Sequence, residues 1–121
     1  MLEAIMTPVL IVTGLVTASL LFQFLSPQTA LRLCNGLEVR DDLTLFFARA
    51  AGLAVTSLGL LLVWAAFVPE IRTPILLVAV LGKSLFVVTI IRNWDLVGKG
   101  FALTVAFDSL CAALYLAYLL S

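Results

Sequence analysis

The chain has 121 residues, of which 64% are hydrophobic and only 12% are charged. Soluble domains average about 45–50% apolar and about 25% charged residues, and a fold of this length has too little interior to bury such an excess. The composition therefore excludes an ordinary soluble domain and predicts a protein that is solvated by lipid. The seven basic and seven acidic residues balance, which argues against a nucleic-acid partner, and the sequence has no histidine, the commonest metal ligand.

The sequence contains four segments that are long and apolar enough to be spanning helices, at residues 4–25, 43–68, 75–92 and 101–120. A helix crosses the hydrocarbon core with about 20 apolar residues. Helices are expected rather than barrel strands, because the segments show no alternating polar pattern. The first segment has no basic region before it and no cleavage site after it, so we expect an uncleaved span rather than a signal peptide.

The links between these segments are short. SPQTALRLCNG, at residues 26–36, predicts a short helix in the membrane interface, with Ser26 as its N-cap, Pro27 at its first position and Gly36 at its end. PEIRTP and NWDLVGKG are predicted as tight links, so consecutive spans should be antiparallel neighbours. We therefore predict an all-α fold: a single transmembrane domain over residues 1–121, forming an integral membrane four-helix up-down bundle with a short interfacial helix after the first span.

Basic residues in the links predict the orientation. The first and third links, with the adjoining helix ends, hold Arg32, Arg40, Arg92 and Lys99, whereas the opposite side has Arg72. Basic residues favour the cytoplasmic side, so both termini are expected on the non-cytoplasmic side. Aromatic residues fit interface belts in this frame: Trp64, Trp94, Tyr115 and Tyr118.

Small residues recur at helical spacing and predict close helix contacts, because they let two backbones approach in lipid. On the first span they are Gly14 and Ala18, on the second Ala48, Gly52, Thr56 and Gly59, and on the fourth Ser109, Ala113 and Ala117. The pattern does not say whether the partner helix belongs to this chain or to another protein.

Ionisable residues inside the spans are the best candidates for a functional site, because a charge at mid-bilayer costs about 2.5–3.5 kcal/mol and rarely faces lipid. Lys83 lies about 13.5 Å from the end of the third span at Arg92, and Asp108 lies about 10.5 Å from the start of the fourth at Phe101. Antiparallel packing brings these depths together, so we predict a buried ion pair between the last two helices.

Neighbouring polar residues could extend this pair. Ser84 and Ser109 follow the two charges in sequence, and Thr104 and Tyr115 share a helix face with Asp108. Two interpretations of the pair are open. In the structural one, the pair fixes the register of the helices. In the functional one, it is a proton relay, an ion pathway or the polar end of a ligand pocket.

Arg49 enters the second span by about 9 Å. Its side chain can reach back to the headgroups, pair with Asp95, or hold a phospholipid headgroup or an anionic cofactor. Cys34 and Cys111 form no redox or metal motif. The tripeptide GKS at residues 82–84 is no phosphate-binding loop, because the required glycine five positions earlier is Leu77.

The stretch FLSPQTALRLCNGL followed by LFFARAAGLAVTSLGLLLVW resembles the small bacterial four-helix membrane proteins of the DoxX-like type. The shared pattern is an apolar first helix, a proline, an interfacial turn ending in glycine, and Arg-x-x-Gly in a Gly-rich second span. The residues that carry it are Pro27, Gly36, Arg49, Gly52 and Gly59. The resemblance implies an accessory subunit of a membrane assembly in a bacterial cytoplasmic membrane.

These observations predict a non-enzymatic integral membrane subunit that packs in the lipid bilayer against other integral membrane proteins, with no catalytic constellation and no metal site. We predict no cofactor, with a bound lipid, quinone or pigment as an open alternative. Two further alternatives remain: a binder of a lipophilic molecule such as a quinone, sterol or pigment, and a small proton-coupled transporter that uses Lys83 and Asp108.

Overall fold

The computed structural model describes residues 2–121, with side chains from Glu3 onward. The described residues are helical and form no strand. Four stretches are long and apolar enough to cross a membrane: Glu3–Leu25, Asp42–Phe67, Pro69–Arg92 and Trp94–Leu120. The predicted all-α fold with its spanning helices is therefore confirmed, and the chain is an integral membrane protein.

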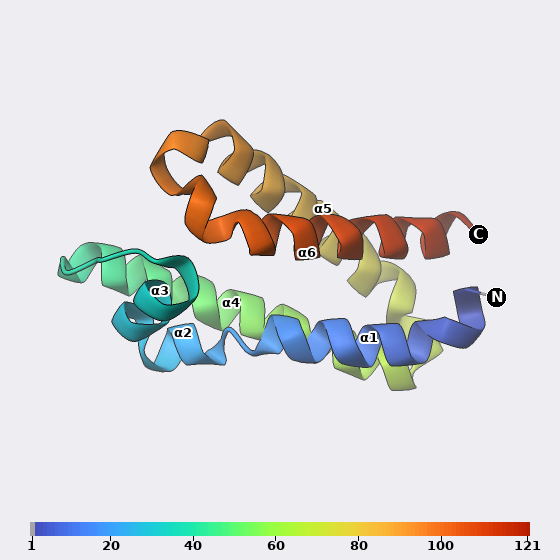
Figure 1. Ribbon diagram of the computed structural model, residues 1–121. Coiled ribbons are helices and arrows are strands. Elements are labelled where there is room, and N and C mark those ends of the chain that lie inside the picture. The colour runs from blue at the N-terminus through green and yellow to red at the C-terminus, as the bar shows by residue number, and fades with distance from the viewer. Residues whose placement is uncertain (1) are drawn as a thin grey trace.

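The long helices associate as two antiparallel pairs. In the first pair, α1 (Leu2–Ala18) and the short α2 (Leu21–Leu25) pack along α4 (Asp42–Phe67), and in the second pair α5 (Arg72–Arg92) packs along α6 (Trp94–Leu120). The pairs lie together near both chain ends and diverge toward α3 (Pro27–Asn35) and the α5–α6 turn (Figure 1). Successive long helices run up and down as predicted.

The first span is interrupted, whereas the sequence predicted one helix over residues 4–25. Helix α1 ends at Ala18, and α2 begins at Leu21. Between them the Ser19 hydroxyl donates to the Val16 carbonyl, and the backbone N–H of Leu20 turns to the carbonyl of Thr17, three residues back. Back-bonding by serine can bend a helix, and the bond from Leu20 to a carbonyl three residues back marks a tightened turn at the break.

The interfacial helix α3 lies close to its predicted position. It ends at Gly36, whose φ of 65° is the left-handed conformation that glycine adopts without strain. Ser26 occupies the N-cap position and Pro27 begins the helix, as predicted, and the Ser26 side chain makes no capping hydrogen bond. Helix α4 is capped by Asp41, which accepts from the Thr44 N–H at 2.8 Å, and hydrogen bonding by the Thr44 side chain and by this N–H lowers the pKa of Asp41.

The predicted links around the last two spans are shorter in the structure. PEIRTP forms a 3₁₀ turn (η1, Pro69–Ile71) and the start of α5, so Pro74 lies in the first helical turn, where its missing N–H costs nothing. The predicted link NWDLVGKG is wrong: α6 begins at Trp94, directly after Asn93. Its glycines accommodate close neighbours rather than end the helix. A Cβ on Gly100, for example, would lie within 1.8 Å of the Asn35 carbonyl oxygen.

Small residues bring α1 and α4 into backbone contact. A Cβ on Gly59 would lie 2.3 Å from the backbone nitrogen of Ala18, and one on Gly14 would lie 2.9 Å from the Gly59 carbonyl oxygen. A Cβ on Gly52 would lie 3.0 Å from the Leu20 carbonyl oxygen in the interrupted part of the first span. These predicted packing residues therefore serve contacts inside the chain.

The remaining predicted packing residues of α4, Thr56 and Ala48, are engaged in hydrogen bonds. The Thr56 hydroxyl is buried and donates to the Gly52 carbonyl at 2.7 Å. The carbonyl of Ala48, a half-buried residue, accepts from the Gln23 side-chain amide at 2.7 Å, which ties α2 to α4.

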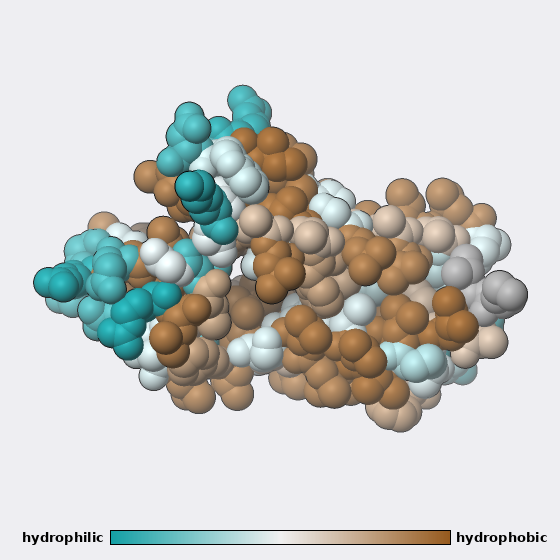
Figure 2. Space-filling model, in the orientation of Figure 1, coloured by the Kyte–Doolittle hydropathy of each residue, from teal (hydrophilic) through white to brown (hydrophobic). Residues whose placement is uncertain are grey.

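Figure 2 shows how polarity is distributed over one face of the molecule. Hydrophobic side chains cover the long helices, and hydrophilic residues gather at the end where α3 and the α5–α6 turn lie. Trp64 and Trp94 are exposed, at 56% and 45%, as interface anchors are. Tyr115 is not one of them, because it is completely buried.

Candidate functional site

The structure brings Lys83 of α5 and Asp108 of α6 together in the middle of the spans. The Lys83 ammonium donates to Asp108 Oδ1 at 2.8 Å, and the two residues are 5% and 8% exposed. Both lie on spanning helices whose other faces are apolar. The depth estimate from the sequence therefore identified two charges that do meet.

A third helix completes the surroundings of the ammonium group. Lys83 Nζ donates to Thr17 Oγ1 of α1 at 3.2 Å and lies 5.2 Å from the centre of the Phe107 ring. The charge therefore links the α5–α6 pair to the α1–α4 pair. Ser84 and Ser109 do not face this site but are exposed, because successive helical residues point about 100° apart.

A second buried bond between the same helix pairs lies about two turns along α6. The Tyr115 hydroxyl donates to Thr13 Oγ1, and the hydroxyls of Thr13 and Thr17 donate in turn to the carbonyls of Val9 and Thr13. Cys111 is buried on the same face of α6, and Thr104 is half-buried there. Thus α6 presents Asp108 and Tyr115 to α5 and α1, which keeps these two polar groups out of lipid.

This polar cluster, which we define as Thr13, Thr17, Lys83, Asp108 and Tyr115, has matched donors and acceptors. Among the side chains that the structure describes, every buried nitrogen and oxygen has a hydrogen-bond partner. A buried charge is tolerated in low dielectric when it is paired and hydrogen-bonded, and a satisfied network favours one arrangement of the helices. The geometry thus suits a role in fixing how the two helix pairs meet.

Arg72 forms a second buried cluster near the chain ends, which the sequence reasoning missed. The residue is 2% exposed, and its guanidinium donates to the carbonyls of Ala65 and Ala66, both at 2.9 Å. It also donates to Thr7 Oγ1 at 3.0 Å and to Glu3 Oε1 at 3.3 Å. The last carbonyls of a helix lack backbone partners. The Arg72 side chain therefore supplies donors to carbonyls at the end of α4 and also joins α4 to α1.

Arg49 and Asp95 are not brought together. Both are exposed, and the ion pairs among the described residues are those of Arg72 with Glu3 and of Lys83 with Asp108. Arg49 lines a hollow of about 450 Å³ beside the start of α3, together with Asp42 and Phe46. The pairing fails because the helix pairs diverge at this end, where antiparallel neighbours had been assumed.

The threonines of the first span were missed, although the sequence carries a signal for them. Thr13 and Thr17 are four residues apart and share the face of α1 that buries Met6 and Leu10. Polar residues at helical spacing in an otherwise apolar span indicate the inner face. No such signal marks Arg72, which lies beside a turn and looks like an ordinary basic residue of a link.

Chemically the polar cluster offers one amine, one carboxylate and three hydroxyls. In residues 2–121 no group of three or more Cys, Asp or Glu side chains is placed to hold a metal ion. Both cysteines, Cys34 on the surface and Cys111 in the core, are free thiols. Comparison with known proteins found no matching family model, no matching curated protein and no matching solved structure.

Proposed function

We propose that the chain is a non-enzymatic accessory subunit that packs through α6 against the spanning helices of other proteins in a membrane assembly. The observation that carries the proposal is a row of small residues along the outer face of α6. Its members are all exposed: Ala102, Ala106, Ser109, Ala113 and Ala117. The row, which we call the small-residue face, extends over about 22 Å at the helical rise.

The same kind of surface is used for helix contacts elsewhere in this molecule. Gly14, Ala18 and Gly59 bring the backbones of α1 and α4 together. Without a hydrophobic driving force between helices in lipid, association depends on such close packing. The small-residue face lies opposite the side of α6 that buries Asp108, Cys111 and Tyr115, so it faces away from the helices of this chain. By the same physics it suits a helix from another protein.

The polar cluster supports this proposal rather than a catalytic one. Lys83 and Asp108 are paired with each other, and Tyr115 is paired with Thr13, so these groups hold the helix pairs in one arrangement. A rigid arrangement keeps the small-residue face in a constant position relative to the rest of the chain. The cluster thus contributes to docking through rigidity.

A pull-down from native membranes tests the proposal. Tagged protein at native abundance is solubilised in mild detergent, and co-purifying membrane proteins are compared for wild type, Ala113→Leu and Ala54→Leu. Ala54 is an exposed alanine of α4, so its replacement is a matched control. We expect Ala113→Leu to release the partner, because the added side chain separates the helices, and Ala54→Leu to retain it.

Two results would contradict the proposal. If the wild-type preparation contains no other membrane protein, the chain has no partner to bind. Equal loss of the partner in both variants assigns the effect to stability or to α4 rather than to the small-residue face. Circular dichroism of each variant shows whether the fold is kept.

The location and orientation follow as part of the same proposal. Both termini are placed outside because Arg32, Arg40, Arg92 and Lys99 lie at the α3 end, and a bacterial cytoplasmic membrane is what the DoxX-like resemblance implies. Both described chain ends lie at the opposite end from α3 (Figure 1), as an even number of spans requires. The DoxX-like resemblance agrees with an accessory role and stays a prediction. A reporter that is active only in the cytoplasm, fused to the C-terminus, should be inactive. Activity of this fusion would contradict the orientation.

A further inference from the structure

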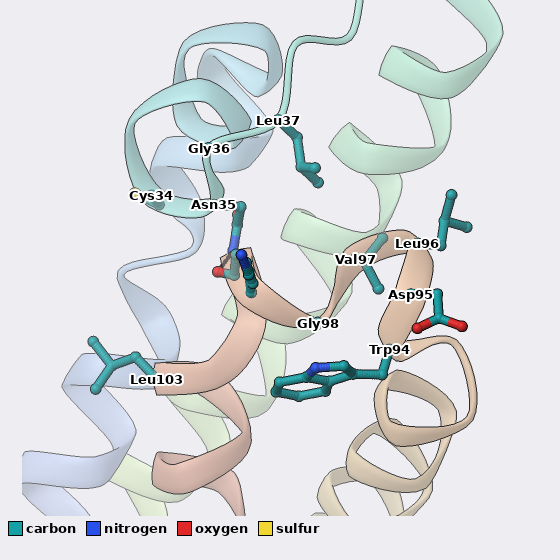
Figure 3. Close-up of a pocket in the computed structure, with 12 residues that line it drawn as sticks. Cys34, Asn35, Gly36, Leu37, Trp94, Asp95, Leu96, Val97, Gly98 and Leu103 are labelled. Carbon is teal, nitrogen blue, oxygen red and sulfur yellow. Dashed lines mark hydrogen bonds between the residues drawn. The ribbon is translucent and has the colours of Figure 1, made fainter.

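A hollow at the polar end of the molecule lies between the end of α3 and the first turns of α6. Its volume is about 750 Å³, which falls in the range of about 300–1,000 Å³ typical of small-molecule sites. Figure 3 shows Leu37, from the loop after α3, above the first turns of α6 and the Trp94 ring below them. Asp95 and Lys99 contribute the charges that line it.

The walls of this hollow are fixed before any ligand binds. The Asn35 side-chain amide donates to the Gly100 carbonyl at 3.0 Å, which joins α3 to α6. The Trp94 ring packs on Gly98, where a Cβ would lie 2.1 Å from the ring. Both glycines are therefore needed for the shape, and a preformed site loses less entropy when a ligand binds.

The charges in the hollow are separate and opposite. Asp95 and Lys99 are one helical turn apart, a spacing at which such residues commonly pair. The ion pairs among the described residues do not include them, and both are exposed. An anion and a cation about 6 Å apart along the helix can therefore each meet a group of opposite charge on a ligand.

The level of the hollow in the membrane selects the ligand. Trp94 is 45% exposed and marks an interface, and the hydrophilic surface of Figure 2 lies at this end. Beside the charges stand Leu96 and Leu103, among the most exposed apolar side chains, at 77% and 83%. A molecule that fits has a phosphate, an ammonium group next to it and an apolar tail.

We propose that this hollow binds the headgroup of a zwitterionic phospholipid with a primary amine, with its phosphate on Lys99, its ammonium on Asp95 and its acyl chains along Leu103, which lies farther along α6. Phosphatidylethanolamine has this chemistry. Phosphatidylcholine lacks N–H donors for the carboxylate, and phosphatidylglycerol lacks the cation. The inference is independent of the proposed partner protein.

Native mass spectrometry of the full chain in detergent tests this site, with phosphatidylethanolamine, phosphatidylglycerol and phosphatidylcholine of identical acyl chains as probes. Wild type should retain phosphatidylethanolamine best. Lys99→Gln should weaken phosphatidylethanolamine and phosphatidylglycerol alike, by about two- to fivefold, because exposed ion pairs contribute modestly. Asp95→Asn should weaken phosphatidylethanolamine by a similar factor and leave phosphatidylglycerol unchanged.

Arg32→Gln is the matched control, since it removes an exposed basic residue at the same end that does not line the hollow. Equal loss in Arg32→Gln and Lys99→Gln would overturn the site in favour of diffuse attraction. Equal retention of the three lipids by wild type would overturn the headgroup selectivity. Glycerophosphoethanolamine, which has the headgroup without acyl chains, should compete poorly. If it binds as tightly as the lipid, the membrane lipid is the wrong source.

Discussion

Removing one partner of the buried ion pair should destabilise the protein strongly. Lys83→Met leaves the Asp108 carboxylate with 8% exposure and without its 2.8 Å donor. Breaking a buried pair in this way costs about 3–5 kcal/mol. Asp108→Asn leaves the buried ammonium group without its carboxylate partner. Its bond to Thr17 remains, so we expect a loss of unfolding free energy near the lower end of this range.

The double variant Lys83→Met/Asp108→Asn separates pairing from simple loss of contacts. With both charges gone, no charge is stranded, so we expect it to be more stable than either single variant. Reversible unfolding in mixed detergent micelles gives the free energies for a double-mutant cycle, in which groups in contact couple by about 0.5–3 kcal/mol. Additive losses in the double variant would refute the reasoning, because they would show that the charges do not interact.

Three further predictions concern contacts that the structure describes. Gly59→Ala should destabilise α1–α4 packing, because its Cβ would lie 2.3 Å from Ala18 N. Gly82→Ala, where nothing lies within 4 Å, should instead stabilise the helix by up to about 1 kcal/mol through helix propensity. Equal changes in the free energy of unfolding in detergent would contradict the packing. Arg72→Met should lower the free energy of unfolding by about 1.5–3 kcal/mol for each lost charged hydrogen bond that is not replaced, and Glu3→Gln by under about 1 kcal/mol, since Glu3 is 68% exposed. Hydrogen bonding from Thr44 lowers the pKa of Asp41 in the folded state, so the ionised Asp41 stabilises the protein fully above the ordinary aspartate pKa of about 3.9. This stabilisation is lost as the pH falls through the lower folded-state pKa. Asp41→Asn should therefore make the free energy of unfolding less dependent on pH below about 3.9, and an unchanged pH dependence would exclude the cap.

The pairing of Lys83 with Asp108 was predicted by counting the rise per residue from the expected ends of the third and fourth spans, and the structure pairs the two residues. The start used for the fourth span was wrong, because Asn93 alone separates α5 from α6. Counted from Trp94, Asp108 lies about 21 Å along α6, whereas Lys83 lies about 13.5 Å from Arg92. The two charges meet because each lies near the middle of its own long helix, and the count from the turn alone does not give their register.

The third partner could not be predicted in the same way. Thr17 meets Lys83 because the α1–α4 pair is rotated and tilted relative to the α5–α6 pair, and no count along one helix gives that angle. Arg72 was missed for a related reason. It stands beside a turn, and its side chain returns to carbonyls six and seven residues earlier, which a hydropathy pattern does not record.

Glycine was the most ambiguous residue type. Gly98 and Gly100 lie in the stretch predicted as a link, but they make room for Trp94 and Asn35 in a continuous helix. Gly36, by contrast, ends α3 with a positive φ, as predicted. The same residue type serves conformational freedom in one place and close approach in the other, and the sequence does not distinguish these uses.

The accessory-subunit proposal is tested most directly by native gel electrophoresis of mildly solubilised membranes, with the chain detected at its natural abundance. We expect a band well above that of the purified 13.0 kDa chain in the same detergent, containing other membrane proteins. Ala113→Leu should return the chain to the position of the purified protein. A wild-type band that already runs with the purified chain would show that the chain has no partner in the membrane.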